Sequence, residues 1–213
     1  MNITIIGAGA GVGKEAVIQA LEKGHYVTAL STNLAMLPDA ANLKKIEGSA
    51  TSKEDVNAAI WNADAILITV GTKKKKGTTL FSDIAKTIIQ LHEEIKFKAP
   101  VIAISGFGVG YSSKYLGLFM KLVISLFLKD QYKDKALMEK LFEESSVNWE
   151  MVQPGMLTNG ALTQSYKTFP GLFKGIKIGK ISRADVAHFM VMEAERQSML
   201  YKKVAITGSP KIN

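Results

Sequence analysis

Four glycines lie close together near the start of the chain, between a short apolar segment and a segment with helical spacing. Residues 5–14 read Ile-Ile-Gly-Ala-Gly-Ala-Gly-Val-Gly-Lys. Glycine lets a backbone turn sharply and approach a phosphate, and a helix that follows presents free N–H groups and its positive dipole end. The spacing is not the G-x-G-x-x-G of the usual fingerprint. The position nevertheless predicts a dinucleotide-binding loop made of Gly7, Ala8, Gly9, Ala10, Gly11, Val12 and Gly13.

The alternative for this segment is a glycine-rich turn between a strand and a helix that binds no ligand. If the loop does bind a pyrophosphate, an aspartate in place of Gly13 should place its carboxylate against the phosphates and abolish binding.

The end of the second predicted strand bears on the choice between dinucleotides. An NAD site usually has Asp or Glu there to bind the ribose diol. Here the positions hold Ser31, Thr32 and Asn33, and the first acid downstream is Asp39. Without a carboxylate, a 2′-phosphate meets no repulsion and finds two hydroxyl donors, although no arginine is present to bind it. NADPH is therefore favoured and NADH stays possible; the alternative is that these are ordinary turn residues.

Strands and helices that alternate along the first half of the chain would position these residues. Strands are predicted over residues 2–6, 25–30, 42–46, 63–70 and 101–104, and helices over residues 12–23, from Ser52 onward and over 79–96. The run 63–70 is almost continuously apolar, as expected of a strand buried on both faces of a parallel sheet. We therefore predict an α/β fold, a Rossmann-like doubly wound parallel sheet, in a single domain spanning residues 1–213 with a small C-terminal segment on the substrate side.

The second half of the chain is less regular. Helices are predicted over residues 115–128, 132–145 and 183–196, and strands over 149–153 and 204–207. The run 115–128 is apolar nearly all round, too short to span a bilayer and poor in a cationic face. These properties favour a buried helix or a dimer contact over a membrane surface.

Motifs at several strand ends resemble those of one protein family. Residues 68–72 read Ile-Thr-Val-Gly-Thr and residues 104–106 Ile-Ser-Gly; residues 148–160 read Asn-Trp-Glu-Met-Val-Gln-Pro-Gly-Met-Leu-Thr-Asn-Gly and residues 181–187 Ile-Ser-Arg-Ala-Asp-Val-Ala. With the glycine loop, they resemble atypical short-chain dehydrogenase/reductases, in particular the NAD(P)H-binding proteins related to biliverdin reductase B, a flavin reductase, and to NmrA-like proteins. Where Gln153 stands, the family usually has arginine.

The resemblance implies a role for each segment. It places the glycine loop around the pyrophosphate, and near the adenosine it places Ser31, Thr32, Asn33, Ser49 and Ala50. It assigns the middle of the cofactor to Val70, Gly71 and Thr72, and the nicotinamide to Ser105, Gly106, Pro154, Gly155, Met156 and Leu157.

The catalytic pair is where the sequence departs from the wider superfamily, which uses Tyr-x-x-x-Lys. No tyrosine here has a lysine four residues later. The resemblance puts Lys135 in the place of the lysine and Gln131 in that of the tyrosine, with Tyr132 about 100° further around a helix. The candidate catalytic residues are Ser105, Tyr132 and Lys135; the alternatives are that Lys135 is an ordinary surface lysine and that Tyr111 and Tyr115 belong to the pocket.

The missing pair affects the predicted reaction. Reduction of a carbonyl needs a proton delivered to oxygen as hydride arrives, whereas a reduced flavin or quinone can take its proton from water. We therefore expect an NAD(P)H-dependent oxidoreductase whose partner is a small flavin-like or quinone-like acceptor. The alternative is a non-catalytic NADP(H)-binding redox sensor of the NmrA-like type.

Composition excludes several other classes. The 213 residues contain no cysteine, and three separated histidines fit no zinc spacing, so no metal site is expected. Of the 27 cations behind the net charge of +8, 25 are lysine, which favours a solvated surface over nucleic-acid binding. Four of them, at residues 73–76, could attract an anionic cofactor or simply form a solvated loop. With no signal peptide, we expect a cytoplasmic monomer or homodimer that binds neither nucleic acid nor membrane.

Overall fold

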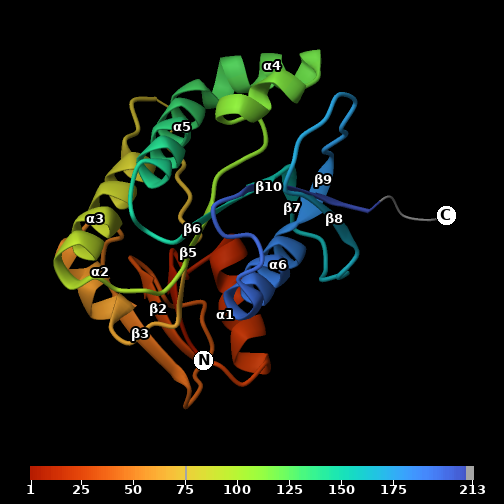
Figure 1. Ribbon diagram of the computed structural model, residues 1–213. Helices are drawn as coiled ribbons and strands as arrows, with labels where there is room; N and C mark the ends of the chain where they lie inside the picture. The colour runs from red at the N-terminus through yellow and green to blue at the C-terminus, as the bar shows by residue number, and fades with distance from the viewer. Residues whose placement is uncertain (75, 210–213) are drawn as a thin grey trace.

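A mostly parallel sheet of eight strands forms the centre of the molecule (Figure 1). The computed structural model describes residues 1–74 and 76–209. Its strands are β1 (Asn2–Ile6), β2 (Tyr26–Ser31), β3 (Leu43–Glu47), β4 (Ala65–Ile68), β5 (Val101–Ile104), β6 (Trp149–Pro154), β8 (Tyr166–Phe169) and β10 (Lys203–Gly208). They lie in the order β3-β2-β1-β4-β5-β6-β10-β8, and only β8 pairs antiparallel with its neighbour. The predicted doubly wound α/β fold is confirmed.

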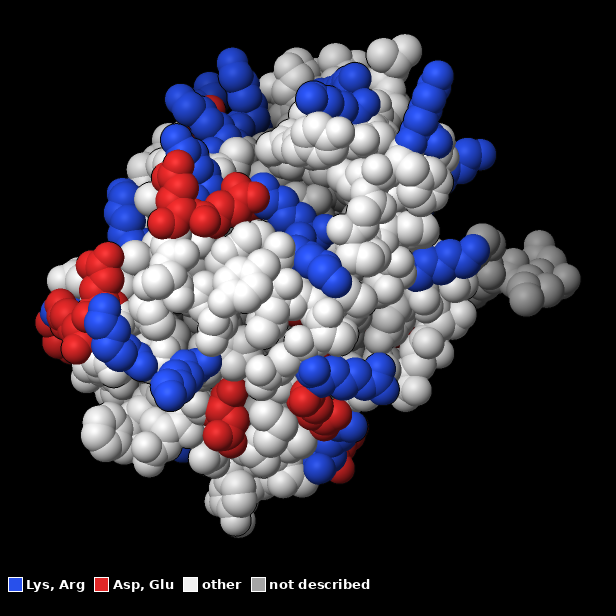
Figure 2. Space-filling view, in the orientation of Figure 1, with Lys and Arg blue, Asp and Glu red and all other residues white. Residues whose placement is uncertain are grey.

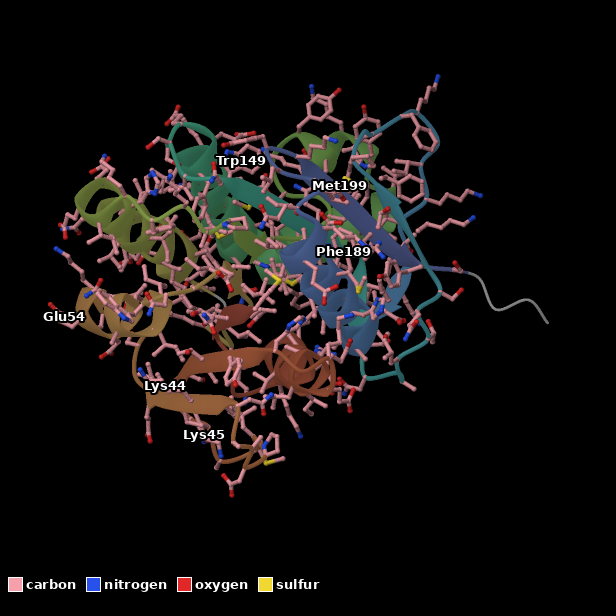
Figure 3. The ribbon with its side chains drawn as sticks, turned by 60° about the horizontal axis from the view of Figure 1, so that its bottom comes forward. Lys44, Lys45, Glu54, Trp149, Phe189 and Met199 are labelled. Atoms are coloured by element: carbon pink, nitrogen blue, oxygen red, sulfur yellow. The ribbon has the colours of Figure 1, made fainter. Side chains whose placement is uncertain are left out.

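Helices cover both faces of this sheet (Figure 1). One face holds α1 (Gly11–Glu22) and α6 (Arg183–Arg196), and the other holds α2 (Lys53–Ile60), α3 (Leu80–Ile95) and α5 (Lys129–Glu143). Alternate residues of β1 supply the two cores: Ile3 and Ile5 pack toward α1 and α6, whereas Ile6 packs toward α2 and α3. Phe189 of α6 is buried, while Lys44 and Lys45 project from the edge strand β3 (Figure 3). Exposed lysines on an edge strand oppose pairing with another chain.

The order of the strands creates a switch point between β1 and β4. From β1 the chain runs outward to β2 and β3, then returns to β4 on the other side of β1 and continues to β5 and β6. Connections on opposite sides leave a crevice beyond the carboxyl ends of the two central strands, where ligands of open α/β sheets bind. The glycine loop follows β1 and residues 69–72 follow β4, so both segments border this crevice.

Side chains at helix starts fix where several helices begin. Ser52 accepts a hydrogen bond from the backbone N–H of Asp55 and caps α2, and Ser182 does the same for Asp185 at the start of α6. The start of α3 is capped from another helix, because Asp134 of α5 accepts from the N–H groups of Phe81 and Ser82 at 2.9 and 3.2 Å. The cap from Asp134 ties α3 to α5 near the opening of the crevice.

A second small sheet, which the sequence did not predict, joins β7 (Met156–Thr158) to β9 (Lys180–Ser182). The strand β8 between them in sequence was also missed. All three strands are short and lack the apolar runs by which the central strands were predicted. In addition, β8 lies on the edge of the main sheet, next to β10.

The prediction of one helix over 115–128 is wrong, and so is the alternative that it is buried, whereas the alternative of a dimer contact stays a prediction. The segment divides into a 3-10 turn η1 (Gly110–Tyr115), a short helix α4 (Leu118–Val123) and one π-helical turn η2 (Ile124–Leu128) that continues into α5. No residue of α4 or η2 is buried, and Leu118 is 86 % exposed. Because the run is apolar nearly all round, burial of one face would still leave apolar side chains exposed, and Leu118, Phe119 and Leu122 lie at the surface.

Candidate functional site

A cleft of about 790 Å³ opens at the switch point, beyond the carboxyl ends of β1, β2 and β4. This volume lies in the range of small-molecule and cofactor sites. Among its lining residues are most of those expected to bind the cofactor: Gly7, Gly9, Ala10, Gly11, Val12, Ser31, Thr32, Asn33, Ser49, Ala50, Val70, Gly71, Thr72, Lys135 and Leu157. Segments that are far apart in sequence therefore meet at one place, as the fold prediction required.

The glycines of the loop make room for three strand ends to meet. A Cβ atom on Gly9 would lie 1.9 Å from the carbonyl oxygen of Asn33, and one on Gly7 would lie 2.7 Å from the backbone nitrogen of Val70. The N–H groups of Gly7 and Ala8 both donate to the carbonyl of Leu30 at the end of β2. The loop is thus held tightly against β2 and β4, which leaves no space for larger residues at these positions.

The start of α1 faces the cleft without a capping side chain. Its N-cap residue Ala10 has no side-chain oxygen, and the first turn contains no acid. The first N–H groups of any helix have no acceptor inside that helix, so those of Gly11 and Val12 are available to a ligand in the cleft. A negatively charged group is the natural acceptor at this position.

Gly13 packs closely against the end of β1 and against Thr69. A Cβ atom there would lie 2.2 Å from the carbonyl oxygen of Gly7 and 2.6 Å from Oγ1 of Thr69, and Gly13 does not line the cleft. An aspartate at position 13 would therefore push α1 away from β1 before any repulsion of phosphates, so the predicted loss of binding has a second, steric cause. Thr69 closes the same contact by donating to the carbonyls of Ile6 and Gly7.

The segments after β2 and after β3, which we predicted to lie near the adenosine, both line the cleft. Asn33 accepts from the N–H of Ala35 at 3.0 Å, which shapes the turn. Asp39, the nearest acid, pairs with Lys45 at 2.7 Å and does not line the cleft. On the opposite side, the N–H of Ser49 donates to Asp55. Among the described residues, no Asp or Glu lines this part of the cleft.

The charge of the cleft is one-sided. Lys73, Lys135 and Arg183 are among its lining residues, and no Asp or Glu is. Lys73 belongs to the predicted cationic run; Lys74 and Lys76 of that run are exposed, and Lys75 lies outside the described residues. Within the described chain, the lining of this cleft thus combines backbone donors with cations, a combination that suits a phosphate-bearing ligand.

A buried carboxylate, Glu139 of α5, organises the region that we predicted for the nicotinamide. It is 1 % exposed and accepts from Oγ of Ser105 at 2.5 Å and from Nε2 of Gln153 at 2.8 Å. Nζ of Lys203 lies 3.0 Å from its second oxygen and also reaches Glu143. Burial disfavours the ammonium of Lys203, but the two carboxylates outweigh that effect and raise its pKa. The side chain of Ser105 is therefore turned into the interior, and Ser105 is not among the residues that line the cleft.

Lys135 and Tyr132 lie near the same point from one face of α5. Nζ of Lys135 donates to the carbonyl of Ser105 at 2.7 Å and lies 4.8 Å from the ring centroid of Phe81. Burial lowers the pKa of Lys135 to about 8, partly opposed by the nearby Glu139. Oη of Tyr132 reaches the carbonyl of Phe107 at 3.4 Å, and burial raises the pKa of this phenol.

Some predicted residues are near the cleft without lining it. They are Ala8, Gly13, Ser105, Gly106, Tyr132, Pro154, Gly155 and Met156. Gly106 lies beside Oη of Tyr132, and Gly155 packs against the carbonyl of Gly179. Tyr111 and Tyr115, the alternative pocket residues, do not line the cleft and pair with each other at 3.2 Å.

Sequence reasoning missed several lining residues, namely Leu30, Met36, Gly48, Thr69, Leu80, Ile104 and Arg183. Most adjoin a residue that was predicted, so extending each strand-end motif by one position would have found them. Arg183 was quoted only as part of a helix-start motif, and Lys203 carried no signal in the sequence. Each comes to this region from a distant part of the chain.

The switch-point cleft and the glycine loop define an α/β protein of the dinucleotide-binding class. The NAD(P)H-binding family model matches residues 7–197, and the chain belongs to this family. Among solved structures, the fold is similar to that of ChuY, an anaerobilin reductase from Escherichia coli O157:H7, with 22 % identity, a TM-score of 0.78 and coverage of 100 % of this chain and 99 % of that one.

Two further structures share the fold. A protein of Streptococcus pneumoniae TIGR4 assigned as an NADH-flavin reductase is 22 % identical, with a TM-score of 0.78 and coverage of 98 % of this chain and 100 % of that one. A short-chain dehydrogenase/reductase from Veillonella parvula DSM 2008, solved with NADP, is 18 % identical, with a TM-score of 0.81 and coverage of 99 % and 95 %. At these identities the similarity establishes the fold.

The described residues contain neither a membrane-spanning helix nor a cluster of metal ligands. No helix in residues 1–74 and 76–209 has the length and hydropathy needed to cross a membrane. Over the same residues, no group of three His, Asp or Glu side chains could hold a metal ion.

Proposed function

We propose that this protein is an NADPH-dependent reductase that transfers hydride to a flavin-like or quinone-like acceptor. The observation that carries the proposal is the lining of the switch-point cleft, with three cations, the start of α1 and no carboxylate. A dinucleotide needs phosphate partners along such a cleft, and a bound nicotinamide cofactor supplies the hydride. The residues of this chain bind that cofactor and position the acceptor.

The preference for NADPH over NADH rests on the end of β2. Ser31 and Thr32 offer hydroxyl groups to a 2′-phosphate, and the lining of the cleft contains no acid that would repel one. An NAD site would instead be expected to hold an acid at this position. We expect NADPH to bind more tightly than NADH.

The choice of acceptor rests on Tyr132 and Ser105, the two hydroxyl groups that we predicted to be catalytic, neither of which is poised to donate a proton. Burial raises the pKa of Tyr132. The pKa of Lys135 is lowered to about 8, but its Nζ donates to the carbonyl of Ser105 at 2.7 Å. The hydroxyl of Ser105 is engaged by Glu139. A carbonyl substrate needs a group that releases its proton readily. A flavin or quinone accepts two electrons with the hydride and takes its proton from water.

The acceptor side of the cleft is assigned to the segment between β6 and α6, the small C-terminal segment of the domain. Leu157 of β7 lines the cleft directly. The same segment contributes Ile176 and the partly buried Phe169, Leu172 and Ile178 to an apolar cluster with Phe107 and Ala205. A planar aromatic acceptor fits beside such apolar groups better than a sugar does.

Turnover assays test the reaction. NADPH oxidation at 340 nm is followed with FMN, riboflavin and quinones as acceptors, and with simple aldehydes and ketones as controls. We expect oxidation with at least one flavin or quinone and none with the carbonyl compounds. Oxidation with the carbonyl compounds alone would contradict the assignment of the acceptor.

A redox sensor that binds NADP(H) without catalysis is the second candidate. The observation that favours it is the apolar surface of α4, where Leu118, Phe119 and Leu122 are more than half exposed and available to a protein partner. Tight NADPH binding without oxidation by any acceptor would support the sensor instead of the reductase.

A further inference from the structure

Arg183 is the first residue of α6 and lies beside the glycine loop. A Cβ atom placed on Gly11 would lie 3.6 Å from both Cδ and Nε of Arg183, and Arg183 lines the cleft. Gly11 begins α1, so the packing of α6 against α1 brings the arginine across the start of the other helix. The guanidinium therefore stands over the first turn of α1.

The position of the arginine is fixed by polar contacts of its own segment. Nη1 donates to Oδ1 of Asn159 at 2.7 Å. Ser182 and Asp185 on either side hold the start of α6, and Asp185 also accepts from the N–H groups of Thr163 and Gln164. The carboxylate of Asp185 is thus turned toward the loop at residues 163–164. In the described part of the chain no carboxylate lies within 4.0 Å of Arg183, so its charge is not neutralised by an ion pair.

We infer that Arg183 binds the pyrophosphate of the dinucleotide and is a main determinant of its affinity. The inference rests on the proposed function. A guanidinium presents a planar set of donors that matches two phosphate oxygens. Asn159 orients one nitrogen and leaves the other donors free for a ligand. The start of α6 thus supplies an arginine for the pyrophosphate, a role separate from that of the segment after β2.

The geometry assigns Arg183 to the pyrophosphate rather than to a 2′-phosphate. Ser31 and Asn33, which we expect near the adenosine, lie beside Gly9, because a Cβ atom on Gly9 would contact both of them. Arg183 lies beside Gly11, two residues further along the loop and on the start of the helix. NADPH and NADH share the pyrophosphate, so the arginine should contribute equally to binding of both.

Dissociation constants for NADPH and NADH, measured by fluorescence titration of the full chain, test this inference. The variants are Arg183→Gln and Arg183→Lys. The matched control is Arg196→Gln, which alters the only other arginine, at the far end of the same helix. Thermal unfolding of each variant without nucleotide checks that the fold is retained.

We expect Arg183→Gln to weaken binding of both nucleotides by about 10- to 100-fold, the loss typical of a hydrogen bond to a charged group. The ratio of the two constants should stay within about threefold of that of the unaltered chain. Arg183→Lys should give a smaller loss, because it keeps the charge and loses the planar fork. It serves as the test if the glutamine variant does not fold.

Two results would overturn the inference while leaving the proposed function intact. One is unchanged affinity in both Arg183 variants, and the other is a loss confined to NADPH, which would move the arginine to the 2′-phosphate. If the unaltered chain binds neither nucleotide, the proposed function fails and this inference fails with it.

Discussion

At the scale of single residues, Gln153 and Lys203 share the task of stabilising the buried carboxylate of Glu139. Gln153 is 1 % exposed and donates to Glu139, so it satisfies one oxygen but brings no charge. The positive charge comes from Lys203 of β10, the strand next to β6. A buried carboxylate that loses its cation is strongly destabilised, so the two positions should be coupled.

This coupling predicts a rescue. Lys203→Met should lower the free energy of unfolding by about 2–3 kcal/mol. This loss lies at the low end of the range for a broken buried ion pair, because the side chain of Lys203 is 25 % exposed. Adding Gln153→Arg should restore much of that loss. Urea denaturation of both variants measures the effect. The control is Lys140→Met, which breaks an exposed ion pair with Glu144 and should change stability by less than about 0.5 kcal/mol. If Gln153→Arg deepens the loss, the account of the charge is wrong.

Glu150 makes a second prediction at this scale. It is 0 % exposed, neither of its oxygens has a hydrogen-bond partner, and burial together with Glu193 raises its pKa to about 8, partly opposed by Lys202. Between pH 4.5 and about 8, Glu150 therefore stays protonated in the folded protein but is ionised in the unfolded chain. Over that interval this group lowers stability as the pH rises, by up to about 1.4 kcal/mol per pH unit.

Glu150→Gln should remove this slope. Denaturation curves at pH 5, 6.5 and 8 should show the variant gaining stability relative to the unaltered protein as the pH rises. Glu22→Gln, at an exposed position, serves as the control and should leave the slope unchanged. A variant whose relative stability does not vary with pH would mean that Glu150 is ionised in the folded protein.

Tyr132 tests the source of the proton. If the proton comes from water, Tyr132→Phe should change kcat with a flavin or quinone by less than about threefold. Removal of a true general acid typically costs about 10²- to 10⁴-fold. Steady-state kinetics with kcat and KM reported separately distinguishes the cases, and a kcat loss above a hundredfold with KM unchanged would assign the phenol a catalytic role.

At the scale of the elements, α4 differs from the other helices in how it contributes to stability. Its apolar side chains are exposed, whereas α5, directly after η2, buries Met138 and Phe142 against the sheet. A helix with no buried face depends on its neighbours for its position rather than contributing to the core. Its apolar residues are thus available for contacts outside the chain.

Matched phenylalanines measure this difference. Phe142→Ala should cost about 3–5 kcal/mol, because the side chain is 0 % exposed and its removal leaves a cavity. Phe119→Ala should cost less than about 0.5 kcal/mol, because the side chain is 71 % exposed. Urea denaturation of the two variants provides the comparison, and equal losses would show that α4 is part of the core.

The elements also show what a sequence can predict. Segments 101–104 and 183–196 were predicted with their observed bounds, because a continuous apolar run and a serine cap with helical spacing identify them locally. Residues 115–128 were misread because the apolar character of a run does not reveal whether another surface covers it. Arg183 and Lys203 could not be assigned for a related reason: their roles depend on partners that only the tertiary fold brings close.

At the scale of the whole molecule, the excess of lysine separates into two parts. Positive side chains are distributed over several elements of the face in Figure 2, including the region around α4 and α5. Such a distribution favours solubility and attraction of anions over recognition of one extended polyanion. The cations that matter for the proposed ligand are the few in the cleft, and the net charge of +8 would assist the approach of a dinucleotide from any side.

The central claim is that the cleft at the switch point binds NADPH. It is tested most directly by titrating the full chain with NADPH and NADH at moderate salt and following nicotinamide fluorescence. We predict saturable binding of one NADPH per chain, with weaker binding of NADH and competition by adenosine 2′,5′-bisphosphate. Absence of saturable binding by either nucleotide, or tighter binding of NADH, would contradict the account.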